Sequence, residues 1–181
     1  MELHNVPYKV SYRAVKYPRL ELKTGELLFV LPFGHNPDIL LEKHKGWILK
    51  RISFIRECLD SAAGKELAVR TGEEFKRLVH SIANKTSKEL KVELSGIYFR
   101  KMSTKWASMS SKGNMTINIL MQSLPDHLVR YVIYHEMVHL IEKRHNGRFW
   151  ATISRKYRNY KKVERDMFTY WFLIAKSHHL L

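Results

Sequence analysis

One stretch of this sequence, from about 125 to 143, would be apolar almost all the way round as a helix. Its apolar residues recur at one-, three- and four-residue steps: Leu128, Val129, Val132, Ile133, Met137, Val138, Leu140 and Ile141. A helix without a polar face is surrounded by protein, because none of its sides suits water. The stretch therefore predicts a helix in the middle of a domain, starting with a capping box at 123–126 and ending at Asn146-Gly147.

Polar side chains interrupt this apolar stretch near its end, in the segment His135-Glu136-Met137-Val138-His139. Burying polar groups costs free energy unless they are paired or bind a metal. The two histidines are four residues apart, so a helix projects them from one face, where both can bind one cation. Glu136 is turned about 100° from His135, which lets its carboxylate reach a water beside the metal. This is the H-E-x-x-H arrangement of zinc peptidases.

A third histidine, His145, follows His139 by six residues. That distance is enough for the chain to leave the helix and turn back, and the Asn146-Gly147 pair tolerates such a turn. Three protein ligands leave one position of a zinc ion open for water, which is typical of a catalytic site. Rival third ligands are Glu142, Glu164 and Asp166. Because Glu142 stands where metzincins have glycine, the chain does not fit that class.

The same residues also allow two simpler interpretations. A single buried histidine is more often a core imidazole that donates to a backbone carbonyl than a metal ligand. The second simpler interpretation is a metal site that has no catalytic role. The spacing of the whole set favours one zinc ion held by His135, His139 and His145, with Glu136 as the general base.

The whole sequence predicts an α+β fold in one continuous domain, 1–181, with an N-terminal hairpin and helices in 1–95 and a catalytic core from about 96 to 181. Apolar alternation around the Thr24-Gly25 turn indicates the β-hairpin. Asn36-Pro37 and the pair Thr71 and Glu74 have the chemistry of helix starts. Strand patterns at 97–102 and 116–120 predict a small mixed or antiparallel sheet packed on helices.

The composition predicts the cellular location and the kind of partner of this chain. Cys58 is the only cysteine, so no intramolecular disulfide can form, and a cytoplasmic location is expected. No apolar run approaches the roughly 18–20 residues of a membrane span, and the first residues lack a signal-peptide pattern. The formal net charge of +15 indicates a polyanionic partner such as nucleic acid.

Much of this charge follows the predicted metal-binding helix directly. Residues 143–165 contain nine Lys and Arg and one acid, Glu164, with interleaved aromatic residues: Phe149, Trp150, Tyr157 and Tyr160. The pattern suits a DNA or other nucleic-acid contact through phosphate neutralisation and base stacking. It suits a solvated helical face with its apolar side turned inward better. The alternative function is therefore a basic nucleic-acid-binding protein with a structural or vestigial zinc site.

Several segments resemble, in the same order, the YgjP-like family of zinc metallopeptidases. This family is related to the small gluzincin-type proteases and, more distantly, to SprT-like and WLM proteases. The resemblance covers nearly the whole chain, through the basic N-terminal hairpin, Trp47-Ile48, and residues 105–114, 135–140 and 145–150. At the positions matching 105–110, the usual sequence of the family is Arg-Trp-Gly-Ser-Cys-Ser. This chain differs at three of them: Lys105, Ala107 and Met109.

The resemblance implies a minigluzincin-like catalytic core around the H-E-x-x-H helix. It implies one Zn²⁺ ion held by His135, His139 and His145, and a peptide or protein substrate cleaved by a zinc-activated water with Glu136 as general base. It also implies that the 116–120 strand is a sheet edge beside the cleft. An extended peptide could then add a strand there, so the expected substrate-binding residues are Thr116, Ile117, Asn118 and Ile119.

Overall fold

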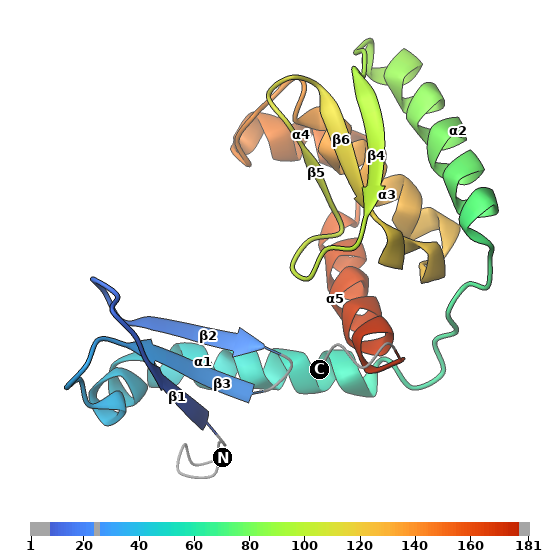
Figure 1. Ribbon diagram of the computed structural model, residues 1–181. Coiled ribbons are helices and arrows are strands. Elements are labelled where there is room, and N and C mark those ends of the chain that lie inside the picture. Colours follow the sequence, from blue (N-terminus) through green and yellow to red (C-terminus); the bar gives the residue numbers. More distant parts are fainter. Residues whose placement is uncertain (1–7, 24–25, 178–181) are drawn as a thin grey trace. The chain divides into compact units, whose positions relative to one another are not determined.

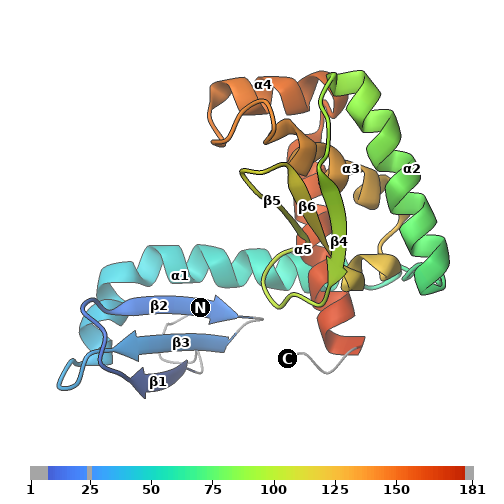
Figure 2. The same cartoon turned by 45° about the horizontal axis from the view of Figure 1, so that its top comes forward.

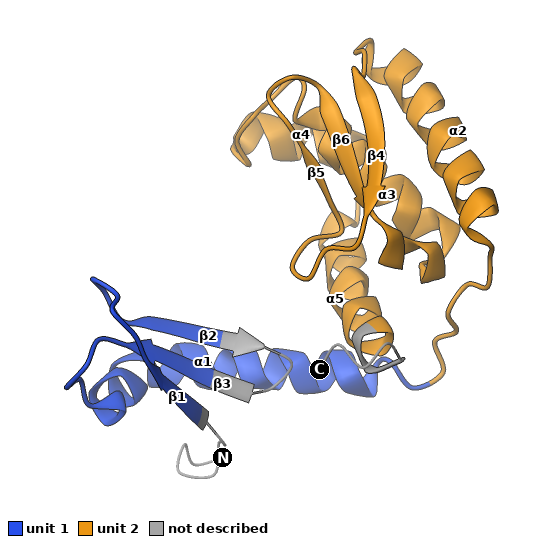
Figure 3. Cartoon of the chain, in the orientation of Figure 1, with its two compact units in different colours: residues 1–63, 181 blue, residues 64–180 orange. Residues whose placement is uncertain are grey.

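The computed structural model describes residues 8–23 and 26–177, which form two compact units (Figure 3). The described part of the first unit ends at Ala63, and the second begins at Gly64. Both combine helices with a small sheet, so the predicted α+β class is confirmed. That the units fold together as one domain with an internal division near residue 95 stays a prediction.

The first unit is a three-stranded mixed sheet with one long helix along a face (Figure 1). Its strands are β1 (Tyr8–Tyr12), β2 (Arg19–Lys23) and β3 (Glu26–Leu31), in the order β1-β3-β2. The antiparallel β2–β3 pair confirms the predicted hairpin, whose Thr24-Gly25 turn lies outside the described residues. Helix α1 (Pro37–Asp60) begins where predicted, since the Asn36 side chain accepts the Asp38 N–H at 2.9 Å. Buried Cys58 lies in this helix.

The second unit has its own mixed sheet, ordered β4-β6-β5 (Figure 1). Its strands are β4 (Gly96–Arg100), β5 (Ala107–Met109) and β6 (Asn114–Asn118). Strand β6 lies in the middle, pairing in parallel with β4 and antiparallel with β5. The expectation that 116–120 is an edge strand is therefore wrong, because both sides of β6 are already hydrogen-bonded. The chain also leaves the strand after Asn118 and enters the short 3₁₀ helix η2 (Ile119–Ser123).

Helix α3 (Asp126–Val138) lies at the centre of this unit, in contact with α2 (Gly72–Leu90), α4 (Gly147–Lys156), α5 (Tyr160–Ser177) and strand β5 (Figure 2). Several of its side chains are completely buried: Leu128, Val129, Ile133, Met137 and Val138. The sequence placed this helix correctly at the middle of the fold, because an all-round apolar helix has to be enclosed.

The two ends of α3 differ from the prediction. No side chain caps its start, and Asp126 instead pairs with Arg70 at 2.7 Å, so the predicted capping box is absent. The helix ends at Val138, several residues before Asn146-Gly147. The apolar pattern runs on to Ile141, but that side chain is 54% exposed and does not belong to the core. Asn146 caps the start of α4, where its side chain accepts two backbone N–H groups.

The Thr71–Glu74 capping box at the start of α2 is present as predicted. The Glu74 side chain accepts the Thr71 N–H at 2.7 Å, and Thr71 Oγ1 accepts the Glu74 N–H at 3.2 Å. Across the part of the chain that the structure describes, no helix combines the length and the apolar character needed to cross a membrane.

Candidate metal centre

Three histidines converge where α3 ends and the chain turns back into α4. His135 lies in the last turn of α3, His139 is its C-cap residue, and His145 directly precedes the Asn146 cap of α4. One ring nitrogen from each histidine can be chosen so that the three atoms lie within 4.8 Å of one another. The early end of α3 makes this possible, because a helix continued to residue 143 would carry the chain away from His135.

The spacing of the imidazoles fits one metal ion. His135 Nε2 and His145 Nε2 are 3.0 Å apart, and the ring of His139 lies 5.4 Å from that of His135 and 4.7 Å from that of His145. Zinc–nitrogen bonds of roughly 2.0–2.1 Å in tetrahedral geometry place ligand nitrogens about 3.3 Å apart. The cluster therefore needs only small side-chain adjustments to bind a tetrahedral cation.

A hydrogen bond fixes which nitrogen of His139 is available. Its Nδ1 lies 3.1 Å from the backbone carbonyl oxygen of Glu142. A carbonyl can only accept, so Nδ1 carries the proton and Nε2 keeps its lone pair. Metal-binding histidines are commonly oriented by such an outer hydrogen bond. His139 is thus held in the tautomer that a metal ligand requires.

The surroundings also favour the uncharged form of His135 and His139. Burial lowers the pKa of His135 to about 3, with a further contribution from the neighbouring His139 and His145. Burial likewise lowers the pKa of His139, partly offset by its hydrogen bond to Glu142. Neutral imidazole is the form that binds a metal, so the lowered pKa values of His135 and His139 favour a cation over protons.

Aromatic rings from α4 form the wall behind the three histidines. Phe149 is completely buried, and its ring centre lies 4.9, 4.7 and 4.6 Å from those of His135, His139 and His145. Trp150 stacks on His145 with ring centres 5.7 Å apart and on Tyr160 at 4.8 Å. His145 is exposed, and these rings and the adjacent Asn146 cap hold it in place.

The rival third ligands have other partners. The Glu142 carboxylate accepts the Arg144 N–H at 3.4 Å. Glu164 accepts the hydroxyl of Tyr131 at 3.1 Å, and Asp166 pairs with Lys65 at 2.9 Å. Among the described residues, the three histidines are the group whose donor atoms converge as a metal site requires.

Glu136 projects from α3 toward strand β5. Burial raises the pKa of its carboxyl to about 7, while a hydrogen bond from the Met109 backbone N–H and the nearby Lys105 ammonium act in the opposite direction. A group with a pKa near the working pH transfers protons most effectively. The sequence pointed to Glu136, but not to Met109 as its partner, because that contact joins residues far apart along the chain.

The predicted substrate-binding residues lie elsewhere in the fold than expected. Ile117 and Asn118 are completely buried, Thr116 pairs with Ser108 of β5, and Ile119 begins η2. The Asn118 amide holds the preceding loop, since it donates to the backbone carbonyls of Met102 and Lys105. These residues do not form an open edge for a peptide.

A cluster of three imidazoles beside a half-buried carboxyl group has the make-up of a metal-dependent hydrolase site. Comparison of the sequence with known families agrees with this class. Residues 61–169, more than half of the chain, match the family described as YgjP-like, metallopeptidase domain. The chain belongs to this family of metallopeptidases, as the resemblance implied.

Two solved structures are similar to part of the chain. The first is the metallopeptidase zymogen abylysin of Pyrococcus abyssi, 20% identical, with 50% of this chain and 92% of that chain covered and a TM-score of 0.47. The second is the metallopeptidase zymogen jannalysin of Methanocaldococcus jannaschii, 25% identical, with 49% and 86% covered and a TM-score of 0.44. No curated protein matches the sequence.

Proposed function

We propose that this chain is a zinc-dependent peptidase in which His135, His139 and His145 hold one zinc ion and Glu136 is the general base. Membership of a metallopeptidase family supports a peptidase that depends on a metal. The observation that carries the assignment of residues is the convergence of three imidazoles beside Glu136. A purely structural zinc site has no use for a carboxylate of this kind.

Each protein group has a defined part in this proposal. A zinc ion bound here would supply Lewis-acid polarisation of the substrate carbonyl and a water of lowered pKa. Glu136 removes a proton from the attacking water and delivers it to the leaving amine. The Met109 N–H orients the Glu136 carboxylate, and the rings of α4 keep the imidazoles in place.

The outer edge of β5 offers a place for an extended substrate. The Trp106 carbonyl accepts the Asn118 N–H at 2.8 Å, so residues 106 and 108 direct their backbone groups toward β6. The backbone groups of alternate residues in a strand point in opposite directions. The N–H and C=O groups of Ala107 and Met109 therefore point to the edge of β5 that faces away from β6. Met109 donates to Glu136 on that side. A peptide that hydrogen-bonds to Ala107 would therefore pass close to the general base.

Metal analysis and a cleavage assay test the proposal together. We expect one zinc per chain after purification without chelators, and loss of the metal when all three histidines are replaced. Casein cleavage by the zinc-loaded protein should fall at least a hundredfold in Glu136→Gln while its zinc content is kept. Zinc-free protein that binds no zinc, or a Glu136→Gln variant as fast as the parent, would refute it.

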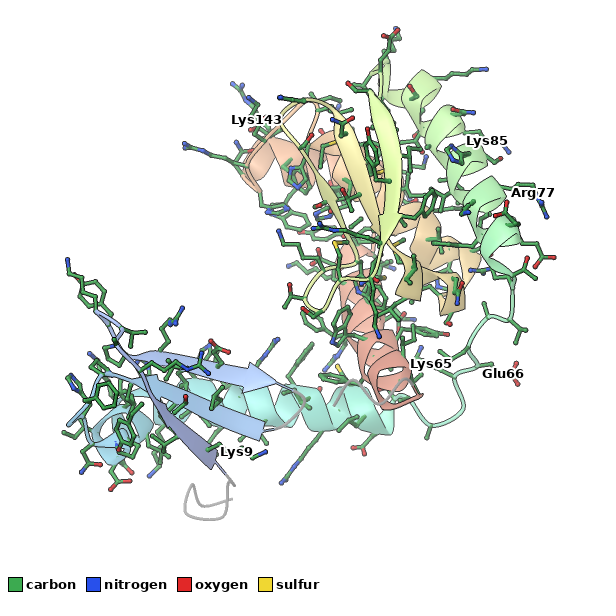
Figure 4. The ribbon with its side chains drawn as sticks, in the orientation of Figure 1. Lys9, Lys65, Glu66, Arg77, Lys85 and Lys143 are labelled. Atoms are coloured by element: carbon green, nitrogen blue, oxygen red, sulfur yellow. The ribbon has the colours of Figure 1, made fainter. Side chains whose placement is uncertain are left out.

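Nucleic-acid binding through 143–165 is the second candidate. All nine cations of this stretch are exposed, as Lys143 is in Figure 4. The aromatic residues are less available, because Phe149 is buried and Trp150 stacks on Tyr160. Phosphate neutralisation is then the main contact, so affinity for a DNA duplex should fall steeply with salt. Absence of DNA binding at about 50 mM salt would remove this candidate.

A further inference from the structure

The connection between β4 and β5 and the adjoining strand ends line an open, cationic pocket with a volume of about 330 Å³. We call it the loop pocket. Its lining is Arg100, Lys101, Met102, Ser103, Thr104, Lys105 and Ser108. Three of these residues are basic, three carry hydroxyl groups, and none is acidic. Neither Arg100 nor Lys101 has an ion-pair partner within the described parts of the chain.

The side-chain amide of Asn118 holds the backbone of this loop through hydrogen bonds. Asn118 is completely buried, and its side chain accepts the Met102 N–H at 3.2 Å. The same side chain donates to the carbonyls of Met102 at 2.8 Å and Lys105 at 2.7 Å. A buried amide with all these partners is costly to disturb. The backbone that carries the cations is therefore fixed before any ligand arrives, which lowers the entropy cost of binding.

The loop pocket adjoins the metal centre through β5. Ser108 lines the pocket, and the next residue, Met109, donates its N–H to Glu136. Lys105 precedes Met109 by four residues, which at about 3.3 Å per residue is a separation of at most about 13 Å. A peptide lying along β5 thus has a side chain within reach of the pocket two to four residues from the cleaved bond.

We propose that the loop pocket is a substrate subsite for a carboxylate side chain, so that this enzyme selects peptides with Asp or Glu close to the cleaved bond. This rests on the proposed peptidase function. The Arg100 guanidinium, the Lys101 and Lys105 ammonium groups and the hydroxyls of the pocket supply hydrogen-bond donors for a carboxylate. A substrate that enters beside β5 carries side chains rather than free anions, which favours an acidic peptide over inorganic phosphate as the occupant.

A binding assay tests the pocket without relying on cleavage. Fluorescein-labelled (Ala-Glu)₄ and (Ala-Gln)₄ are titrated by anisotropy with the zinc-loaded Glu136→Gln protein at low salt. We expect the acidic peptide to bind at least tenfold more tightly. The added substitution Lys101→Glu should remove most of that difference, whereas Lys85→Glu, at an exposed lysine of α2 (Figure 4), should not.

Three outcomes of this assay would overturn the subsite. One is equal binding of the two peptides. Another is an equal loss in Lys85→Glu, which would show attraction to the general charge of +15. The third is displacement by micromolar inorganic phosphate under conditions where acetate has no effect, which would assign the pocket to phosphate. Circular dichroism spectra that match the parent show that the variants are folded.

A cleavage assay separates this proposal from the proposed function. Unfolded casein is digested, and the cleaved bonds are located by mass spectrometry. The parent should show Asp or Glu within four residues of the cleaved bond several times more often than chance, and Lys101→Glu should lose this preference. Cleavage without the preference refutes the subsite alone. Absence of zinc-dependent cleavage refutes the peptidase function, and the binding assay still decides the pocket.

Discussion

The two sides of the candidate metal centre are built in different ways. His135 and His139 come from one helix end, and their separation follows from the pitch of α3. His145 comes from an exposed turn, and it is held by Phe149 and Trp150 and by the Asn146 cap of α4. The helix pair depends on local geometry, whereas the third ligand depends on tertiary packing. Variants can therefore weaken one side while leaving the other intact.

The largest expected effect is the loss of a ligand from the helix pair. His139→Ala should lower zinc affinity more than a hundredfold, because loss of an outer-sphere partner alone already costs 10–100-fold. His145→Ala should have an effect of the same order if the histidine triad is the site. Competition with a zinc-binding dye measures both. A His145→Ala variant that kept the parental affinity would assign the third position to another ligand.

Phe149→Ala should cause the largest loss of stability, because it removes a completely buried ring that contacts all three imidazoles. Large-to-small changes of this kind cost about 3–5 kcal/mol. Urea unfolding of the metal-free protein measures the change in the free energy of unfolding. Phe168→Ala is a matched control, since that ring is 40% exposed and should cost much less. Similar losses for both variants would contradict the packing described.

Asn146→Ala should act on the third ligand alone. Loss of an N-cap costs about 1 kcal/mol, and the start of α4 would no longer hold the adjacent His145. We expect a loss of zinc affinity of about tenfold, by analogy with other supporting residues of metal sites. The control is Asn36→Ala at the start of α1, which should lose similar stability with unchanged zinc affinity. Equal effects on zinc from both variants would show that the cap does not position His145.

The smallest effect lies away from the metal centre, at the capping box of α2. Hydrogen bonds from the Thr71 backbone and side chain hold the pKa of Glu74 below its usual value. A carboxyl with a depressed pKa in the folded state stabilises the protein above its unfolded pKa, and this contribution is lost as the pH falls through the folded pKa. Glu74→Gln should therefore be less stable than the parent at pH 7, and the difference should shrink as the pH falls below the unfolded pKa of about 4.3. Thermal unfolding at a series of pH values measures it, and a constant difference would contradict the assignment.

Part of the fold and of the candidate site could be predicted from sequence because the elements concerned are local. The H-E-x-x-H spacing, the Asn36 cap and the Thr71–Glu74 capping box join residues only a few positions apart. The sequence predicts too late an end for α3, because Leu140 and Ile141 continue the apolar period although they lie outside the core. The order of the strands was also missed, since apolar alternation marks a strand without indicating its neighbours.

By itself, the sequence determined that His135, Glu136 and His139 interrupt an apolar helix, with two histidines spaced as metal ligands can be and a carboxylate next to the first. Helical periodicity is a local property, so these features need no knowledge of the rest of the chain. Only the tertiary structure decided that the chain turns back at His139, and that β4 and β5 rather than β6 form the edges of the second sheet. It also brought Lys105 of the loop pocket close enough to lower the pKa of the Glu136 carboxyl. Those features depend on contacts between residues distant in sequence, such as Asn118 with Lys105, and no local pattern encodes them.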